Sequence, residues 1–225
     1  MESKDNCDMF CGGKNVVFPL SGRLQISDIQ IKKEKNRGWY FSYFGNYPNN
    51  PKIALVSLCP AHTQLKYFVE LYNKNKSFEE SATNSGFQKM RKNIAKILRR
   101  KELDKYLGLK ISDDFDFNNN DNFLVTSLVK CASTKEGKGR SNQYDLLKYD
   151  CSRLCIINRF INEILRYKSI EKIVIFGKVA EKVVKEVLIE NKSTWKILNS
   201  EGREIIFVPH PSTANNKAIK IFLSN

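Results

Sequence analysis

The stretch KIVIFG at residues 172–177 decides the fold class, because it is a short and continuous apolar run that ends in a glycine. Continuous apolarity is typical of a strand covered on both faces, as in a parallel sheet, and it predicts a strand over residues 172–176. Three further runs have the same character, at residues 53–58 (IALVSL), 123–129 (FLVTSLV) and 204–208 (EIIFV). The four runs predict a central, mostly parallel four-stranded sheet.

Helical periodicity fills the intervals between these strands. Apolar residues recur every three or four positions over residues 87–100, 151–167, 180–190 and 215–223. Strands that alternate with helices predict an α/β protein, a three-layer α/β/α sandwich over residues 51–225. Residues 1–50 fit this pattern poorly, so we expect an N-terminal extension with a hairpin near residues 38–45. Residues 113–122 and the basic, Gly-rich residues 133–142 are predicted loops.

The composition limits the classes of protein that this chain can belong to. Its 225 residues carry 38 Lys and Arg against 24 Asp and Glu, and 41% of them are hydrophobic, which excludes wholesale disorder. The apolar runs are too short for a membrane span, and the polar start MESKDNCDMF is unlike a signal peptide. We therefore expect a soluble, cytoplasmic monomer. The net charge of +14 fits a nucleic-acid partner, an anionic membrane surface or a merely lysine-rich surface, the membrane least well.

The residues that follow the four strands form the predicted site, because ligands of open parallel sheets bind at the carboxyl ends of the strands. In chain order these segments are CPAH (59–62), KCAS (130–133), GK (177–178) and PHPS (209–212). Both histidines of the chain, His62 and His210, lie in these segments. The pattern predicts an active site on this rim of the sheet.

Four segments, in this order, resemble the motifs of the uracil-DNA glycosylase superfamily. They are SLCPA (57–61), TSLVKC (126–131), IFG (175–177) and HPS (210–212). The resemblance implies a monofunctional DNA glycosylase, which flips a damaged or modified base out of the stack and hydrolyses its N-glycosidic bond. It implies DNA as the partner, and the positive charge would hold the phosphates.

The resemblance also implies roles for individual residues. His210 would donate a hydrogen bond to the departing base, whose negative charge develops in the transition state. Pro60 and Ala61 would shape the base pocket, and Lys130 would lie on the DNA-binding face. Pro211 and Ser212, with the first amides of the last helix, would hold a phosphate.

This sequence departs from the family at two positions. Leu58 stands where an acidic or amide residue often lies, which leaves His62 and Asn84 as candidates to orient the attacking water. Ser127 replaces the asparagine that reads uracil, and a hydroxyl lacks the paired donor and acceptor of an amide. The base is therefore left open between uracil, a hypermodified pyrimidine and a deaminated purine. Phe78 and Phe87 are candidates to stack on it.

The cysteines extend the resemblance, since some branches of the superfamily hold a [4Fe–4S] cluster on four thiolates. Cys7, Cys11, Cys131 and either Cys151 or Cys155 occupy the corresponding places. Zinc at the same ligands and buried thiols without a metal are the alternatives. Two other functions stay open for the whole chain: a catalytically weak nucleic-acid binding or sensing protein of this fold, and another α/β enzyme that acts on nucleosides or nucleotides.

Overall fold

A parallel four-stranded sheet lies at the centre of the protein. The computed structural model describes residues 23–34, 37–40, 45–46, 48–74, 77–87, 89–135, 146, 150–189, 196, 198 and 202–224. The sheet has the order β4-β3-β6-β7, and all its neighbouring strands are parallel. Its members are β3 (Ile53–Ser57), β4 (Phe123–Ser127), β6 (Lys172–Phe176) and β7 (Glu204–Val208). The predicted parallel sheet is confirmed.

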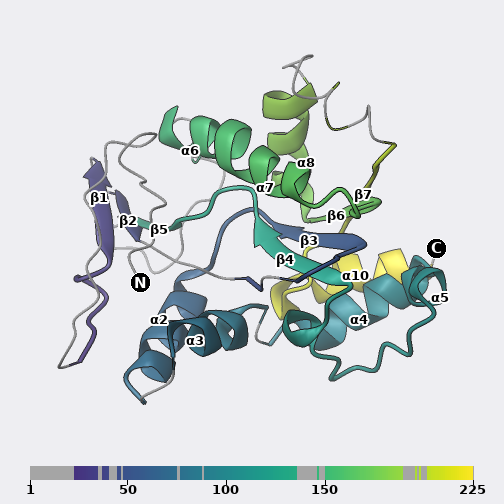
Figure 1. Cartoon of the computed structure of the whole chain (residues 1–225), viewed down its shortest axis with the longest axis horizontal. Helices are drawn as coiled ribbons and strands as arrows, with labels where there is room; N and C mark the ends of the chain where they lie inside the picture. Colours follow the sequence, from purple (N-terminus) through teal and green to yellow (C-terminus); the bar gives the residue numbers. More distant parts are fainter. Residues whose placement is uncertain are drawn as a thin grey trace.

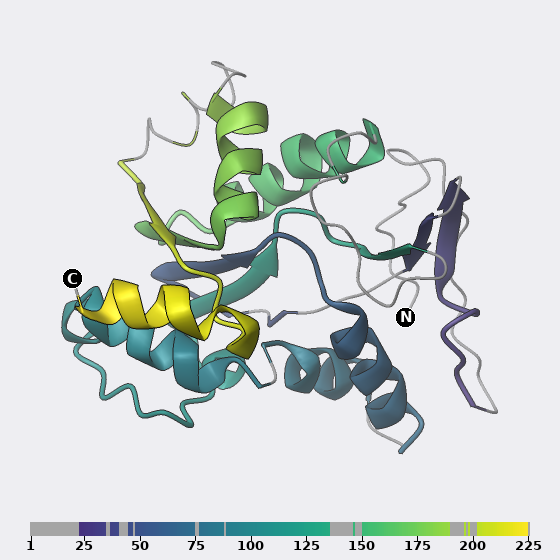
Figure 2. The same cartoon turned by 180° about the vertical axis from the view of Figure 1, so that it is seen from behind.

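Helices cover both faces of this sheet (Figure 1). One face carries α6 (Asp150–Leu154), a π-helical segment (Cys155–Phe160), α7 (Ile161–Arg166) and α8 (Lys178–Val184), which continues into a second π-helical segment (Lys185–Ile189). The other face carries α4 (Arg91–Arg100), α5 (Leu103–Leu107) and α10 (Asn216–Ser224), with α10 alongside α4 (Figure 2). Because side chains alternate along a strand, the two faces of the sheet contribute to two separate apolar cores. The predicted three-layer sandwich is confirmed.

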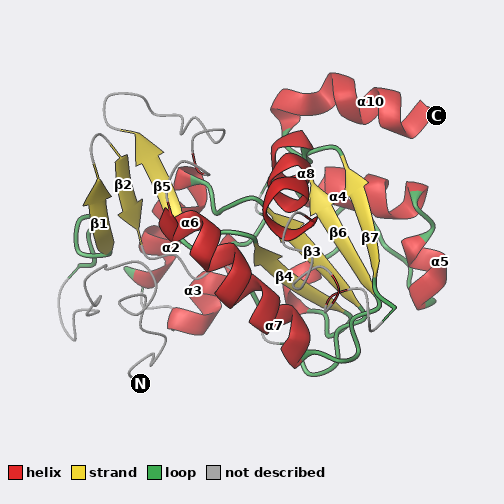
Figure 3. Ribbon diagram, turned by 90° about the horizontal axis from the view of Figure 1, so that it is seen from above, coloured by secondary structure: helices red, strands yellow, loops and turns green. Residues whose placement is uncertain are grey.

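A smaller lobe lies beyond the carboxyl ends of β3 and β4 (Figure 3). It contains α2 (His62–Tyr72), α3 (Phe78–Ser85) and an antiparallel sheet of β1 (Gln30–Glu34), β2 (Arg37–Tyr40) and β5 (Ala132–Lys135). A third apolar cluster joins α2 and α3 to Leu24, Ile29 and Ala132. The chain segments that follow β3 and β4 therefore both belong to this lobe.

The structure corrects several predicted elements. β1 and β2 pair as antiparallel strands between Gln30 and Tyr40, and residues 41–44 of the predicted hairpin lie outside the described residues. Residues 133–135 belong to strand β5 rather than to a loop, because they pair with β2. Residues 136–142 of that predicted loop lie outside the described residues. Helices α2, α3 and α5 were not predicted, and the helix predicted from residue 87 begins at Arg91. Within the described part of the chain, no helix has the length and apolar composition that a membrane span needs.

Candidate functional site

A hollow lies where β3 and β4 end. Its enclosed cavity is about 10 Å³, and the space rises to about 220 Å³ when the part open to solvent is counted. The hollow is lined by Ser57, Pro60, Gln64, Gly86, Phe87, Val125, Thr126 and Ser127. Two of the predicted base-binding residues, Pro60 and Ser127, thus meet at one place. They meet because β3 and β4 are parallel neighbours whose ends stand in register, with Ser57 beside Ser127.

Phe87 is the aromatic residue of this hollow. Its backbone is in the left-handed region (φ 49°), and its ring, 3% exposed, stands edge-on to Phe176 with the centroids 5.6 Å apart. The buried Asn118 fixes this loop, since its Nδ2 donates to the Gly86 carbonyl (2.9 Å). A Cβ at residue 86 would lie 2.9 Å from Asn118 Oδ1, so any larger residue there would displace the Asn118 side chain. Of the two aromatic candidates, Phe87 lines the hollow, whereas Phe78 packs against Phe68 in the third apolar cluster.

Ser127 offers the hollow an acceptor. The side chain is 4% exposed, and its hydroxyl donates to the Val129 carbonyl (2.9 Å). A hydroxyl has one proton and two lone pairs, so the proton is used within the turn after β4 and the lone pairs remain.

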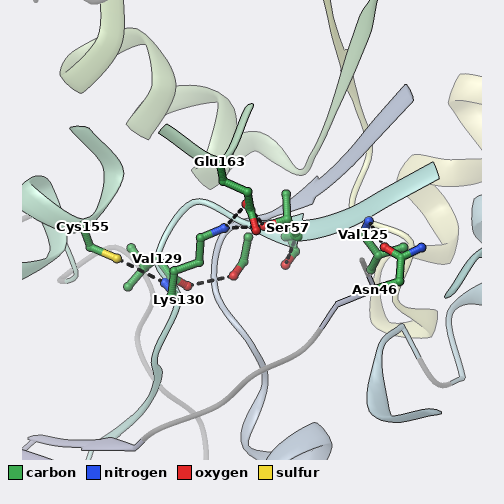
Figure 4. A network of polar contacts seen from close by, with 9 residues as sticks. Asn46, Ser57, Val125, Val129, Lys130, Cys155 and Glu163 are labelled. Carbon is green, nitrogen blue, oxygen red and sulfur yellow. Dashed lines mark hydrogen bonds and ion pairs between the residues drawn. The ribbon is translucent and has the colours of Figure 1, made fainter. Parts of the chain in front are cut away.

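Lys130 lies in an ion pair beside the hollow (Figure 4). Its ammonium group contacts the hydroxyl of Thr126 and the carboxylate of Glu163, and Thr126 Oγ1 is 2.5 Å from Glu163 Oε2. The lysine and glutamate side chains are 20% and 25% exposed. The charge of Lys130 is therefore paired with that of Glu163 on α7, and its place on the DNA-binding face stays a prediction.

His210 lies directly after β7, and burial lowers the pKa of its imidazole, which is neutral at neutral pH. The amide of Ser212 donates to His210 Nδ1 (3.2 Å), so the single proton of the neutral ring sits on Nε2. Asn93 of α4 holds the same loop by donating to the Pro211 carbonyl (2.8 Å). The loop thus supplies a neutral hydrogen-bond donor, although His210 is not among the residues that line the hollow.

The hydroxyl of Ser212, the predicted phosphate ligand, is also used within this loop. Its Oγ accepts a hydrogen bond from Asn215 Nδ2 (2.9 Å). Both polar groups of Ser212, amide and hydroxyl, therefore take part in shaping the turn that leads into α10.

The two predicted water-orienting residues, His62 and Asn84, lie on different helices, α2 and α3. His62 is the first residue of α2, and the centroid of its ring lies 6.4 Å from that of Tyr40. Burial is the larger cause that lowers the pKa of His62, and the positive charge of Lys66 is the smaller one. Asn84 is exposed on α3 and donates to the Glu80 carbonyl (2.8 Å) of its own helix, so the structure does not bring it to the hollow. Gln64 lines the hollow instead.

Cys59, which follows Leu58 in the first motif, is buried and is not a reactive thiol. Burial raises the pKa of its thiol to about 12, with Arg37 opposing the shift. A thiol with that pKa holds its proton at neutral pH and packs as a small apolar side chain.

Two of the predicted cluster ligands lie near each other in the fold. The amide of Lys130, the residue before Cys131, donates to the sulfur of the buried Cys155 (3.4 Å). Cys7 and Cys11 lie outside the described residues, as does the side chain of Cys151. Among the side chains that the structure describes, no three His, Cys, Asp or Glu residues converge on one point.

Three residues of the site were missed by sequence reasoning: Gln64, Asn118 and Glu163. Gln64 stands three positions after the N-cap Ala61, a place where Glu and Gln commonly reach back to the cap, and this spacing could have revealed it. Asn118 and Glu163 act across 32 and 37 positions of sequence, and no local pattern indicates such contacts.

These features define an α/β protein with an aromatic-lined hollow at its strand ends and a neutral histidine after its last parallel strand. A family model of the uracil DNA glycosylase superfamily matches residues 44–223. The chain belongs to this superfamily, and the resemblance of the four motifs is confirmed. No curated protein matches the sequence.

Proposed function

We propose that the protein is a monofunctional DNA glycosylase that hydrolyses the N-glycosidic bond of a flipped, damaged or modified base. Membership of the superfamily supports a glycosylase-type activity on DNA. The observation that carries the proposal is the neutral His210, whose Nδ1 accepts from the Ser212 amide and whose Nε2 keeps its proton. The proposed substrate also fits the predicted cytoplasmic location.

The proposed chemistry assigns each group one task. The C1′–N bond breaks and its electron pair moves to the base nitrogen, while Nε2–H of His210 donates to a carbonyl oxygen of the departing anion. Water adds to C1′, and the proton that it loses ends on the departing base anion, so that a neutral base and an abasic site are released. His62, with its lowered pKa, is neutral and is the group we assign to accept that water's hydrogen bond. Phe87 would stack on the flipped base.

Positive charge for the phosphates would come from exposed lysines around this rim. Lys66 on α2, Lys89 beside Phe87, and Lys178 after β6 are all exposed. Each phosphate contact releases counterions, so DNA affinity should fall steeply as salt rises.

A panel of oligonucleotides tests the activity. It carries uracil, hypoxanthine, xanthine or modified cytosines, with phage DNA beside it, and abasic sites are scored for wild type and His210→Ala. We expect at least one base to be excised by wild type and His210→Ala to be slower by about 100-fold or more, the usual effect of removing one such donor. Excision at equal rates by both proteins would overturn the role of His210.

A second function is favoured by the first motif. Leu58, 4% exposed, stands in place of an acid or amide, which fits a catalytically weak protein that binds or senses modified DNA. Salt-dependent DNA binding without cleavage of any base in the panel would establish this alternative.

We also propose a [4Fe–4S] cluster on Cys7, Cys11, Cys131 and either Cys151 or Cys155. The Lys130 amide that donates to Cys155 Sγ fits such a site, because cluster-bound sulfurs accept backbone hydrogen bonds. The cluster would fix the N-terminal segment to the turn after β4. Iron and sulfide are measured in anaerobic wild type, Cys131→Ala, Cys151→Ala and Cys155→Ala, with Cys59→Ala as the control. Loss of iron in Cys131→Ala and in one of the next two supports the cluster, and an iron-free wild type overturns it.

A further inference from the structure

We infer that Gln64 reads the flipped base, supplying the amide donor that Ser127 cannot, so that the site prefers bases with a carbonyl beside a ring N–H. This inference rests on the proposed function and names its substrate class. Gln64 lies on the first turn of α2, half-buried, and lines the hollow together with Ser127 and Phe87. It is a specificity residue, separate from His210 and His62.

The orientation of the Gln64 amide is fixed by its neighbour. The backbone N–H of Ala61 donates to Gln64 Oε1 (2.7 Å), and an N–H group can only donate. The oxygen must therefore face Ala61, and Nε2 must face the other way. Nε2 carries two protons and is 3.5 Å from the Ser85 carbonyl, at the limit of hydrogen-bond distance. One proton is thus left for a group inside the hollow.

Ser127 supplies the complementary group. Because its proton is donated to Val129, it accepts from any base that reaches it. The hollow therefore presents a donor on α2 and an acceptor at the end of β4. An imide or lactam edge matches this pair, with the exocyclic oxygen at Gln64 and the ring N–H at Ser127. A cytosine or adenine edge would place its exocyclic amino donor against the Gln64 donor and its ring nitrogen acceptor against the Ser127 acceptor, so it does not match.

Gln64→Glu isolates the donor. The carboxylate keeps an oxygen for the Ala61 N–H, and a Glu at this position of a helix is favourable for capping and for the helix dipole. The substitution replaces Nε2–H₂ by an acceptor, which also removes the long contact with the Ser85 carbonyl. A thermal unfolding midpoint equal to or above that of wild type would show that the fold is kept.

The experiment measures binding, which does not require cleavage. Single-stranded oligonucleotides carry one 2′-fluoroarabino nucleotide, either uracil or cytosine, whose glycosidic bond resists hydrolysis. We expect wild type to bind the uracil strand more tightly, and Gln64→Glu to lower the uracil-to-cytosine affinity ratio by about tenfold or more, the value of one hydrogen bond to a charged or buried group.

The outcomes separate this inference from the proposed function. An equal affinity ratio in wild type and Gln64→Glu overturns the reading role of Gln64, even if wild type excises bases. If Gln64→Glu lowers the uracil-to-cytosine affinity ratio but neither protein excises a base, Gln64 reads the base and only the proposed glycosylase activity is wrong. A wild-type preference for cytosine overturns the substrate class.

Discussion

The amide of Ser212 points its hydrogen at Nδ1 of His210, 3.2 Å away, and this bond decides which ring nitrogen of the histidine holds the proton. A protonated Nδ1 could not accept that bond, so the loop favours the neutral ring. Burial acts in the same direction by lowering the pKa of His210. The neutral Nε2–H donor is therefore available without any charge to desolvate when DNA binds.

The pH dependence of excision follows from this arrangement. Because the pKa of His210 lies below its usual 6.5, the ring should be neutral at pH 7, and acid should protonate it only below pH 6.5. Protonation of His210 would break the Ser212 bond, and protonation of His62 would remove the acceptor for the water. The single-turnover rate should therefore be level near neutrality and fall by about tenfold or more per pH unit below the lowered pKa values. Rates measured from pH 5 to 8 test this. A rate that rises on acidification would contradict it.

Gly177 is predicted to be required for the position of His210. Its φ is +97°, and a Cβ there would lie 3.0 Å from the Cβ of His210. Gly177→Ala should therefore lower stability by about 1–2 kcal/mol through backbone strain and slow excision by about tenfold or more. Denaturant unfolding and single-turnover rates measure the two effects.

Gly202→Ala is the matched control, because Gly202 also has a positive φ (+70°) but nothing within 4 Å of its Cβ position. It should lose similar stability and keep the wild-type rate. Equal rates in the two variants would show that the contact with His210 has no catalytic role.

The sheet could be predicted from sequence because each strand is a continuous apolar run. All four runs are strands, and two of them, β6 and β7, have the predicted bounds. Helix α2 was missed because its polar residues obscure the apolar face formed by Leu65, Phe68 and Val69. Strand β5 was missed because its lysine and serine content indicates a loop, whereas pairing with β2 makes it a strand.

The sequence predicts the part of the site that lies near the strand ends, and it does not predict contacts between residues far apart in the chain. Residues at or shortly after strand ends, such as Pro60, Ser127 and His210, stand on one rim because parallel strands end together. Lys130 also follows a strand, but it forms an ion pair with Glu163. Tertiary packing makes this contact, so the sequence does not predict it. Asn84 was a candidate to orient the attacking water, but its side chain is exposed and donates to the Glu80 carbonyl of its own helix.

Lys130 is predicted to be a structural residue, since its ion pair with Glu163 joins the turn after β4 to α7. Lys130→Met should lower the free energy of unfolding by about 1.5–3 kcal/mol, because it leaves a partly buried carboxylate without its cation. A double-mutant cycle with Glu163→Gln should show a clear coupling energy.

The exposed pair Lys52 and Glu171, 3.1 Å apart with side chains 40% and 54% exposed, is the control. Lys52→Met should change the free energy of unfolding by less than about 1 kcal/mol. If Lys130→Met instead left stability unchanged but weakened DNA binding at low salt, the lysine would be a phosphate contact as the sequence predicts.

Asn46 completes the free edge of β4, and we predict that it determines the stability of that strand. Its Oδ1 accepts from the Val125 amide (2.8 Å) and its Nδ2 donates to the Phe123 carbonyl (2.7 Å), so the side chain takes the place of a neighbouring strand. The chain approaches so closely that a Cβ on Gly45 would lie 2.5 Å from the Val125 carbonyl oxygen. Asn46→Ala should therefore leave two buried backbone groups without partners and cost about 2–4 kcal/mol.

Asn49→Ala is the matched control for this edge, since Asn49 is exposed and bonds only to Asp121 at 3.3 and 3.4 Å. Its cost should stay within about 0.5 kcal/mol, the usual range for surface substitutions. Hydrogen exchange adds a local measurement, because the Val125 amide should exchange much faster in Asn46→Ala while the amides of β6, in the middle of the sheet, change only with global stability. If the Val125 amide kept its protection in Asn46→Ala, the edge of β4 would be held by the backbone of residues 45–46 and not by the side chain.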